Sequence, residues 1–258
     1  MNSPNHLVFT VTSGRSGTKY LAQALNEFKN VTSLHEPDPN FKDYMVKSQF
    51  DKDEAITFWK ERKLPQIFKT VTTPVYIETS HLFSKGFALP LLELGVVPDL
   101  IILVRPERQV ASSLYRMGII PYKTRLGKRW FLSPDYPNTL VKITQNPFKL
   151  HDYQLCYWYC LEVRERQNYL RDIFKKSGST IFDVGFQDLV SDRHKALQEI
   201  KYAYGLHNKF HPPFSSALNK NKKGVYGNGE LTGEEKNDLE NDLLKNIEIY
   251  KSLNKIWI

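Results

Sequence analysis

Short apolar runs alternate with amphipathic stretches along much of the chain. Runs rich in β-branched residues at 6–12, 98–105 and 179–186 predict buried strands. Apolar residues at helical spacing follow the first run, over 17–28. Because strands that alternate with helices form parallel sheets, we expect an α/β fold: a single domain with a central parallel β-sheet flanked by helices.

The segment between these strong signals predicts further elements. A second strand ends near Leu34, and residues 43–62 and 83–94 look helical. Two segments, QIFKTV at 66–71 and VYIET at 75–79, are both strand candidates.

Later in the chain, three longer helices are predicted, at 151–176, at 187–205 and at 232–253, the last with Thr232 near its N-cap. Before them, residues 118–150 hold prolines, aromatics and cations without a period. Loops of that length are usually functional or disordered. We expect one domain over 1–258, with 118–150 as an ordered insertion or a mobile lid.

The charge of the chain narrows the class of partner. The 258 residues carry a formal net charge of +8, which suits an anionic partner. The basic stretches are interrupted, which favours a basic cleft for a small anion over an arm that binds nucleic acid.

Cysteine and hydropathy patterns exclude other classes. The two cysteines, Cys156 and Cys160, fit a helix face rather than a disulfide framework or a zinc site, so no metal is expected. No signal peptide precedes the first strand and no apolar stretch is long enough to span a membrane. We expect a cytoplasmic protein.

The loop after the first strand has the composition of an anion cradle. The segment TSGRSGTKYL joins that strand to a helix, whose free N–H groups and dipole attract negative charge. Gly14 and Gly17 allow a tight curl, and Arg15 adds a fixed charge. Hydroxyls come from Ser16 and Thr18.

Two common nucleotide motifs do not fit this loop. A P-loop needs Gly-Lys followed by Ser or Thr, but Gly17 is followed by Thr18, and Lys19 by Tyr20. The dinucleotide pattern also fails. A plain Gly/Ser turn that starts a helix stays an alternative.

Two further segments suit anions. Arg105 follows the clearest strand and Ser113 lies in the next helix; since ligands bind outside the carboxyl ends of parallel strands, Arg105 is expected to share a crevice with Arg15. Near the end, KKGVYG at 222–227 can close over an anion or form a solvated basic loop.

The order and spacing of these three segments resemble the sulfotransferases that use 3′-phosphoadenosine 5′-phosphosulfate (PAPS). The resemblance assigns cofactor binding to Arg15, Ser16, Gly17, Thr18, Lys19 and Tyr20 at the 5′-phosphosulfate, to Arg105 and Ser113 at the 3′-phosphate, and to Lys222, Lys223 and Gly224 in the late loop. Gly14 replaces the family's usual Pro, and Lys19 replaces a second Thr. The segment FQDLVSD at 186–192 is similar to the family's Tyr-Glu-Asp-Leu, with Gln187 in place of Glu.

The resemblance implies a P-loop NTPase-like sulfotransferase fold and a reaction. A sulfuryl group would move in line from PAPS to a hydroxyl or amine of a small-molecule acceptor, with Arg15 stabilising the leaving oxygen. No metal is needed for this scheme. The insertion at 118–150 would then lie on the acceptor side.

Two residues are candidates for the general base that an alcohol requires. Glu36, in SLHEPDP, resembles the catalytic Glu of tyrosylprotein-type sulfotransferases, and His81, in ETSHLF, resembles the Thr-His of the cytosolic small-molecule class. We favour Glu36, because it ends a strand that is expected beside the loop.

Two other functions stay open at this point. A P-loop-type nucleotide or metabolite kinase shares the topology but lacks its Gly-Lys-[Ser/Thr] here. A catalytically silent module that retains the nucleotide cleft is the other alternative.

Overall fold

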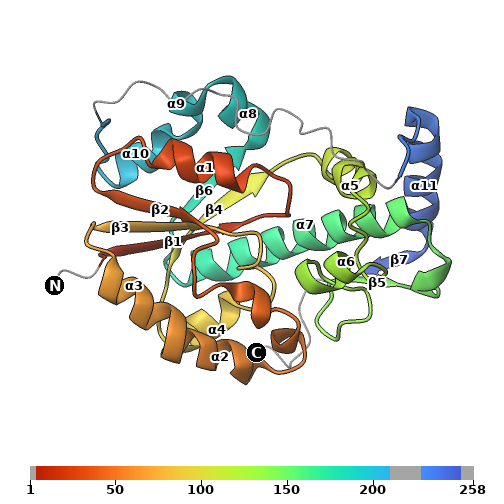
Figure 1. Ribbon diagram of the computed structural model, residues 1–258, viewed down its shortest axis with the longest axis horizontal. Helices are drawn as coiled ribbons and strands as arrows, with labels where there is room; N and C mark the ends of the chain where they lie inside the picture. The colour runs from red at the N-terminus through yellow and green to blue at the C-terminus, as the bar shows by residue number, and fades with distance from the viewer. Residues whose placement is uncertain (1–3, 210–227, 251–258) are drawn as a thin grey trace.

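Five strands form a parallel sheet in the order β2-β3-β1-β4-β6 (Figure 1). The computed structural model describes residues 4–209 and 228–250. The strands of the sheet are β1 (His6–Val11), β2 (Val31–His35), β3 (Val75–Thr79), β4 (Asp99–Val104) and β6 (Ile181–Gly185). The predicted α/β architecture, a central parallel sheet flanked by helices, is confirmed.

Helices cover both faces of this sheet (Figure 1). One face carries α1 (Thr18–Leu25), α8 (Phe186–Ser191), α9 (Arg193–Ala196) and α10 (Gln198–Ala203). The other carries α2 (Lys52–Phe58), α3 (Leu64–Thr70), α4 (Ala88–Glu93) and part of α7 (Asp152–Lys176). Shorter helical turns are η1 (Phe41–Asp43), η2 (Lys47–Gln49), η3 (Trp59–Lys63) and η4 (Pro147–Lys149).

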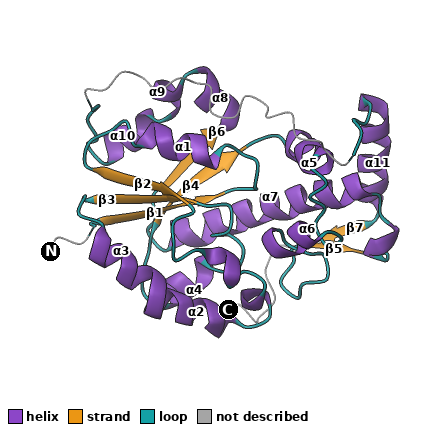
Figure 2. Cartoon of the chain, viewed as in Figure 1, coloured by secondary structure: helices purple, strands orange, loops and turns teal. Residues whose placement is uncertain are grey.

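The N-terminal half of α7 extends beyond the sheet and packs against a second group of elements (Figure 2). These are α5 (Glu107–Arg116), α6 (Arg125–Trp130), α11 (Gly233–Lys245) and the antiparallel pair β5 (Val141–Ile143) and β7 (Ile247–Ile249). Together they bury a cluster that includes Trp158 and Tyr159 of α7. The central helix therefore links the sheet to this end of the molecule.

The strand period distributes the core over the two faces of the sheet. Phe9 and Val11 of β1 pack into a cluster rich in aromatic rings, while Val8 packs on the opposite side against α1. Each of these three side chains is fully buried. A strand buried on both faces needs such a continuous apolar run.

Three of the sequence-based assignments were wrong. QIFKTV lies in α3 rather than in a strand, because Ile67 and Val71 face the core at helical spacing. The helix predicted at 187–205 is three short helices, interrupted at Asp192, whose side chain caps α9. The C-terminal helix ends at Lys245, and residues 247–249 pair with β5.

A buried ion pair fixes the loop that follows β2. Lys63 Nζ lies 2.8 Å from Glu78 Oε2, and the two side chains are 1% and 0% exposed. The same ammonium donates to the carbonyls of Pro37 (3.2 Å) and Pro39 (2.8 Å). Tyr76 Oη donates to Glu78 over 2.6 Å. Because Lys63 contacts the Glu78 carboxylate and also donates to the two loop carbonyls, the pair ties residues 37–39 to β3.

Removal of Lys63 is expected to destabilise the protein in a pH-dependent way. Burial raises the pKa of Glu78 and Lys63 lowers it. In Lys63→Met the pKa of folded Glu78 therefore rises further above its unfolded value, so stability falls as pH rises through that window. We expect the free energy of unfolding to fall by about 3–5 kcal/mol at pH 8 and by less at pH 5. Each kcal/mol lost lowers the melting temperature by roughly 2–4 °C.

Thermal unfolding at both pH values measures this effect. The matched control is Lys60→Met, which removes an exposed lysine of the same segment and should change little. An equal loss at pH 5 and pH 8 would contradict the role of Glu78.

Candidate functional site

Four candidate residues lie beyond the carboxyl ends of four parallel strands. Arg15 comes after β1, Glu36 directly after β2, His81 after β3 and Arg105 directly after β4. After β1 the chain continues to β2, on one side of β1 in the sheet, and after β4 it continues to β6, on the other side. The direction of the connections therefore reverses between the neighbouring strands β1 and β4. Such a switch point is where open α/β sheets bind ligands.

The loop from Ser13 to Gly17 has the backbone of an anion cradle. Arg15 and Gly17 both have positive φ, 68° and 88°. Gly17 is the N-cap of α1, so no N-cap side chain occupies the free N–H groups of the first turn. A Cβ on Gly17 would lie 2.6 Å from the ring of Phe186. This position therefore requires glycine for both conformation and space.

The two arginine motifs, far apart in sequence, form one cluster. Arg15 Nε donates to Ser113 Oγ over 3.3 Å, and Arg105 Nη1 donates to the carbonyl of Arg15 over 2.7 Å. The Arg105 guanidinium lies 4.5 Å from the centre of the Phe186 ring, which orients it from the other side. The structure thus brings together Arg15, Arg105 and Ser113, as the sequence predicted.

The electrostatics of this cluster favour an anion. Burial lowers the pKa of Arg105, and the nearby charges of Arg15 and Arg116 lower it further. These guanidinium groups remain charged and repel one another. A phosphate or sulfate between them would relieve that repulsion and accept several charge-assisted hydrogen bonds.

Glu36 and His81, predicted as alternative bases, lie side by side. His81 Nε2 is 3.5 Å from Glu36 Oε1, and the two side chains are 11% and 18% exposed. That carboxylate oxygen is buried and has no hydrogen-bond partner among the described residues. Glu36 has a φ of 47°, a conformation uncommon for residues other than glycine. A buried acceptor without a donor, held in an unusual backbone conformation, is typical of a functional site.

His81 stays uncharged at neutral pH. Burial lowers its pKa well below the ordinary value, and Lys85 and His35 add to this effect. Its contact with Glu36 is therefore one between a neutral imidazole and a carboxyl group, not an ion pair.

Aromatic residues of the 118–150 segment connect this pair to the anion loop. The His81 ring stacks with Phe131 at a centroid distance of 5.6 Å and with Trp130 at 6.2 Å. A Cβ on Gly14 would lie 3.1 Å from the Phe131 ring and 3.4 Å from His81 Nδ1. Gly14 thus allows His81 and Phe131 to close directly onto the loop.

Two functional neighbours were not predicted from the sequence. Tyr159 of α7 accepts a hydrogen bond from the Gly14 N–H over 3.1 Å and so fixes the loop. Lys85 contacts His81 from the side opposite Glu36, with Nζ 2.8 Å from His81 Nδ1. The spacing of four residues between His81 and Lys85 was the only signal in the sequence, and Tyr159 gave none.

The remaining residues predicted to bind the cofactor lie in the anion loop, at the start of α1, or outside the described residues. Ser16 contributes its hydroxyl to the loop itself, 2.6 Å from Ser13 Oγ, while Thr18 and Tyr20 are buried and Lys19 is exposed at the start of α1. Lys222, Lys223 and Gly224 lie outside the described residues.

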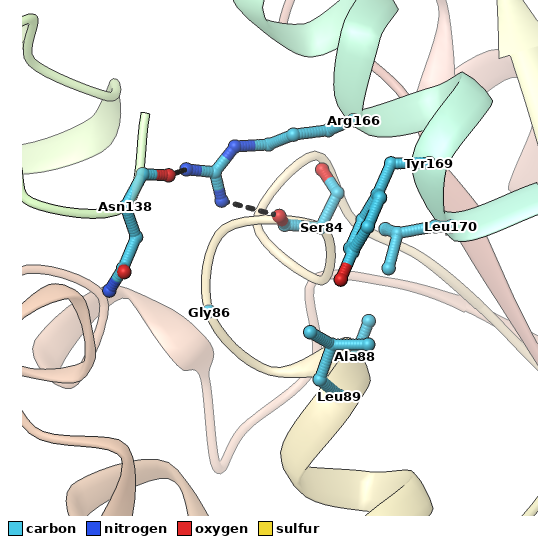
Figure 3. A pocket seen from close by; sticks show the side chains of 8 residues that line it. All are labelled: Ser84, Gly86, Ala88, Leu89, Asn138, Arg166, Tyr169 and Leu170. Carbon is cyan, nitrogen blue, oxygen red and sulfur yellow. Dashed lines mark hydrogen bonds between the residues drawn. The ribbon is translucent and has the colours of Figure 1, made fainter. Parts of the chain in front are cut away.

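A small pocket has none of the arginine-cluster residues in its lining, which includes Ser84, Asn138 and Arg166 (Figure 3). Its Arg166 donates to the carbonyls of Ser84 (3.1 Å) and Asn138 (2.5 Å) and to Glu162 (2.7 Å). Glu162 in turn accepts from the backbone of residues 140 and 141. The pocket wall therefore anchors the 118–150 segment beside the His81 turn.

The described residues show neither a metal-binding cluster nor a membrane-spanning helix. Over residues 4–209 and 228–250, no group of three or more His, Cys, Asp or Glu side chains is arranged to hold a metal ion. In the same residues no helix has both the length and the apolar character needed to cross a bilayer.

Comparisons with known proteins find the fold but no sequence relative. The chain is similar to the sulfotransferase domain from the curacin biosynthetic pathway, with a TM-score of 0.51 and 15% identity over 82% of this chain and 77% of that chain. It is also similar to a sulfotransferase from Alicyclobacillus acidocaldarius, with a TM-score of 0.52 and 16% identity over 86% and 88% of the two chains. No family model and no curated protein matches the sequence. The chain therefore has the fold of these sulfotransferases, as the sequence motifs predicted.

Gly17→Ala is expected to destabilise the fold and to weaken binding of inorganic sulfate. A Cβ there meets the Phe186 ring in addition to the strain of a positive φ, which by itself costs about 1–2 kcal/mol. The matched control is Gly95→Ala, where φ is also positive but no atom lies within 4 Å of the new Cβ. Urea unfolding should show a larger loss for Gly17→Ala, and calorimetry should show weaker sulfate binding in this variant only. Equal losses in the two variants would mean that Phe186 does not restrict the loop.

Proposed function

We propose that this chain is a sulfotransferase that moves a sulfuryl group from PAPS to a hydroxyl or amine of a small-molecule acceptor. The observation that carries the proposal is the convergence of two anion motifs on one site. Arg105 donates to the carbonyl of Arg15, and Arg15 donates to Ser113, although Arg15 belongs to the first motif and the other two residues belong to the second. The fold shared with two solved sulfotransferases supports the same function.

The residues present fit a donor with two separate phosphate groups. The cradle at Gly17 has no room for a side chain, and its helix end offers free N–H groups to a 5′-phosphosulfate. The loop residues for this end are Arg15, Ser16, Gly17, Thr18, Lys19 and Tyr20. Arg105 and Ser113 would hold the 3′-phosphate, and Lys222, Lys223 and Gly224 remain the predicted residues of the late loop.

PAPS, when bound, supplies the activated sulfuryl group, and the protein positions the reactants and balances charge. Arg15 is proposed to stabilise the negative charge that develops on the leaving oxygen, since it lies in the anion loop two residues before Gly17, the N-cap of α1. Glu36 is proposed to take the proton from the acceptor, because its Oε1 is a buried acceptor without a hydrogen-bond donor.

His81 is proposed to support Glu36 rather than to replace it. Its pKa is held well below the ordinary value by burial and by neighbouring cations, so the imidazole takes up a proton reluctantly. Trp130 and Phe131 stack on the His81 ring. Their position supports the proposal that residues 118–150 lie on the acceptor side.

Binding of 3′,5′-adenosine bisphosphate is expected to stabilise the protein more than Mg-ATP does. Arg15 and Arg105 offer one guanidinium to each of its two phosphates, whereas the Gly-Lys-[Ser/Thr] of an ATP-binding P-loop is missing. At about 100 times the dissociation constant, binding adds about 2.7 kcal/mol, and each kcal/mol raises the melting temperature by roughly 2–4 °C. A larger thermal shift with Mg-ATP would favour a kinase.

Arg105→Ala separates the two phosphate positions in the same assay. Loss of one partner of a desolvated charge pair costs about 2–5 kcal/mol. The variant should therefore lose most of its preference for the bisphosphate over 5′-AMP. An unchanged preference, measured by calorimetry, would remove Arg105 from the 3′-phosphate site.

Glu36→Gln is expected to lower turnover by roughly 10²–10⁴-fold while the affinity for the bisphosphate changes little. The amide keeps the shape of the carboxylate but cannot take a proton. His81→Asn should cost less, and the double variant should be little worse than Glu36→Gln alone, because the two side chains act as one unit. Turnover is measured by mass spectrometry with PAPS and a panel of alcohols, phenols and amines. A dead His81→Asn beside an active Glu36→Gln would reverse the two roles.

A further inference from the structure

Lys85 is a buried cation whose surroundings consist of hydrogen-bond acceptors and aromatic faces. The side chain is 0% exposed. Its Nζ lies 2.7 Å from the carbonyl oxygen of Trp130 and 2.8 Å from His81 Nδ1. The rings of Phe131 and Tyr159 face it at 4.7 and 4.8 Å. A carbonyl, a ring nitrogen and two π faces suit an ammonium group, which donates hydrogen bonds and accepts none.

The contact with Lys85 determines which ring nitrogen of His81 carries the proton. A neutral imidazole has one donor nitrogen and one acceptor nitrogen. With Lys85 as an ammonium, which only donates, Nδ1 is the acceptor and the hydrogen lies on Nε2. Nε2 is the atom that faces Glu36 Oε1 at 3.5 Å. In this tautomer His81 offers a donor to the carboxylate and no lone pair to the acceptor substrate.

We propose that Lys85 is a positioning residue that fixes His81 in the Nε2–H tautomer, so that His81 orients Glu36 for proton transfer. This inference rests on the proposed role of Glu36 as general base. The chain Lys85–His81–Glu36 crosses from the buried turn at residues 81–87 to the end of β2. It assigns the three side chains different tasks: Lys85 sets the tautomer, His81 turns its Nε2–H toward Glu36 at 3.5 Å, and Glu36 takes the proton of the acceptor.

The arrangement predicts a dependence on alkaline pH. Burial lowers the pKa of Lys85, Arg166 lowers it further, and the nearby Glu36 and Cys160 oppose this effect. Burial raises the pKa of Tyr159 and of Cys160, so both stay protonated while Lys85 loses its proton. A neutral amine can accept a hydrogen bond from Nδ1–H. Nε2 then loses its hydrogen, and His81 no longer presents an N–H toward Glu36 as pH rises.

The first test reads the histidine directly and needs no turnover. Nitrogen-15 NMR of ring-labelled histidine, assigned with His81→Asn, reports the protonation of each His81 nitrogen. We expect a bare Nδ1 and a protonated Nε2 in the wild type at neutral pH. In Lys85→Met the Nδ1 resonance should shift because its hydrogen bond is lost, and the pKa of His81 should rise toward its ordinary value. A protonated Nδ1 in the wild type, or an Nδ1 resonance that Lys85→Met leaves unchanged, overturns the inference.

The second test is kinetic. Lys85→Met should lower kcat at least about tenfold, but by less than the roughly 10²–10⁴-fold loss that follows removal of a base, with the KM for PAPS unchanged. The alkaline fall of the wild-type pH profile should be absent from the variant. Lys69→Met, which removes an exposed lysine, is the matched control and should behave as the wild type does. A Lys85→Met enzyme with wild-type kcat and pH profile overturns the positioning role.

The two tests separate this inference from the proposed function. If the wild type transfers no sulfuryl group to any acceptor, the proposed function fails, while the NMR experiment still decides the contact between Lys85 and His81. If Lys85→Met does not fold, the nitrogen-15 spectrum of the wild type at neutral and alkaline pH decides the inference by itself. A bare Nδ1 that becomes protonated at alkaline pH supports the inference, and a protonated Nδ1 at neutral pH overturns it.

Discussion

Parallel pairing of β1 with both β3 and β4 is the constraint on which the rest of the structure depends. It directs every strand of the sheet the same way, so the loops that follow β1, β2, β3 and β4 meet at one edge. The strands separate there, and buried polar groups bridge them. Gln167 of α7 donates to the carbonyls of Val11 (3.0 Å) and Leu103 (3.2 Å), and Thr12 donates to Leu103 over 2.7 Å. These bonds hold the opening where Arg15 and Arg105 converge.

The long helix α7 contacts the sheet, the anion loop and the 118–150 segment through its polar side chains. Tyr159 fixes the backbone of the anion loop, Gln167 bridges the strand ends, and Arg166 with Glu162 anchors residues 138–141. One rigid element thus positions the loop, the opening and the 118–150 segment. A site built in this way is preorganised, since its polar side chains are already held by partners in the protein.

Charge is distributed unevenly across this edge of the sheet. The arginine cluster is open to solvent and its charges repel one another, which favours an anionic ligand. The chain of Lys85, His81 and Glu36 is buried, so small changes in protonation there have large effects on hydrogen bonding. An exposed cationic cluster and a largely buried set of titratable side chains thus share one edge of the sheet.

Local sequence patterns determined the strong elements and the anion motifs. The apolar runs of β1 and β4 are nearly continuous because both of their faces are buried, and that signal needs no tertiary information. Gly17 and Arg15 also carry their meaning locally, since a tight turn before a helix requires glycine and attracts anions. The motif order was sufficient to predict the fold and the approach of Arg105 to Arg15, but not the contact between Arg15 and Ser113.

Only the tertiary structure decided the remaining features. Residues 66–71 have a strand-like composition, but their contact with the aromatic core makes them helical. Residues 247–249 became a strand because β5 offered them a partner. Glu36 and His81 were competing candidates in the sequence, where nothing indicates that their side chains meet. Lys85 had no functional signal beyond its spacing of four residues from His81, and Tyr159 had none, because its contact with Gly14 joins residues far apart in the sequence.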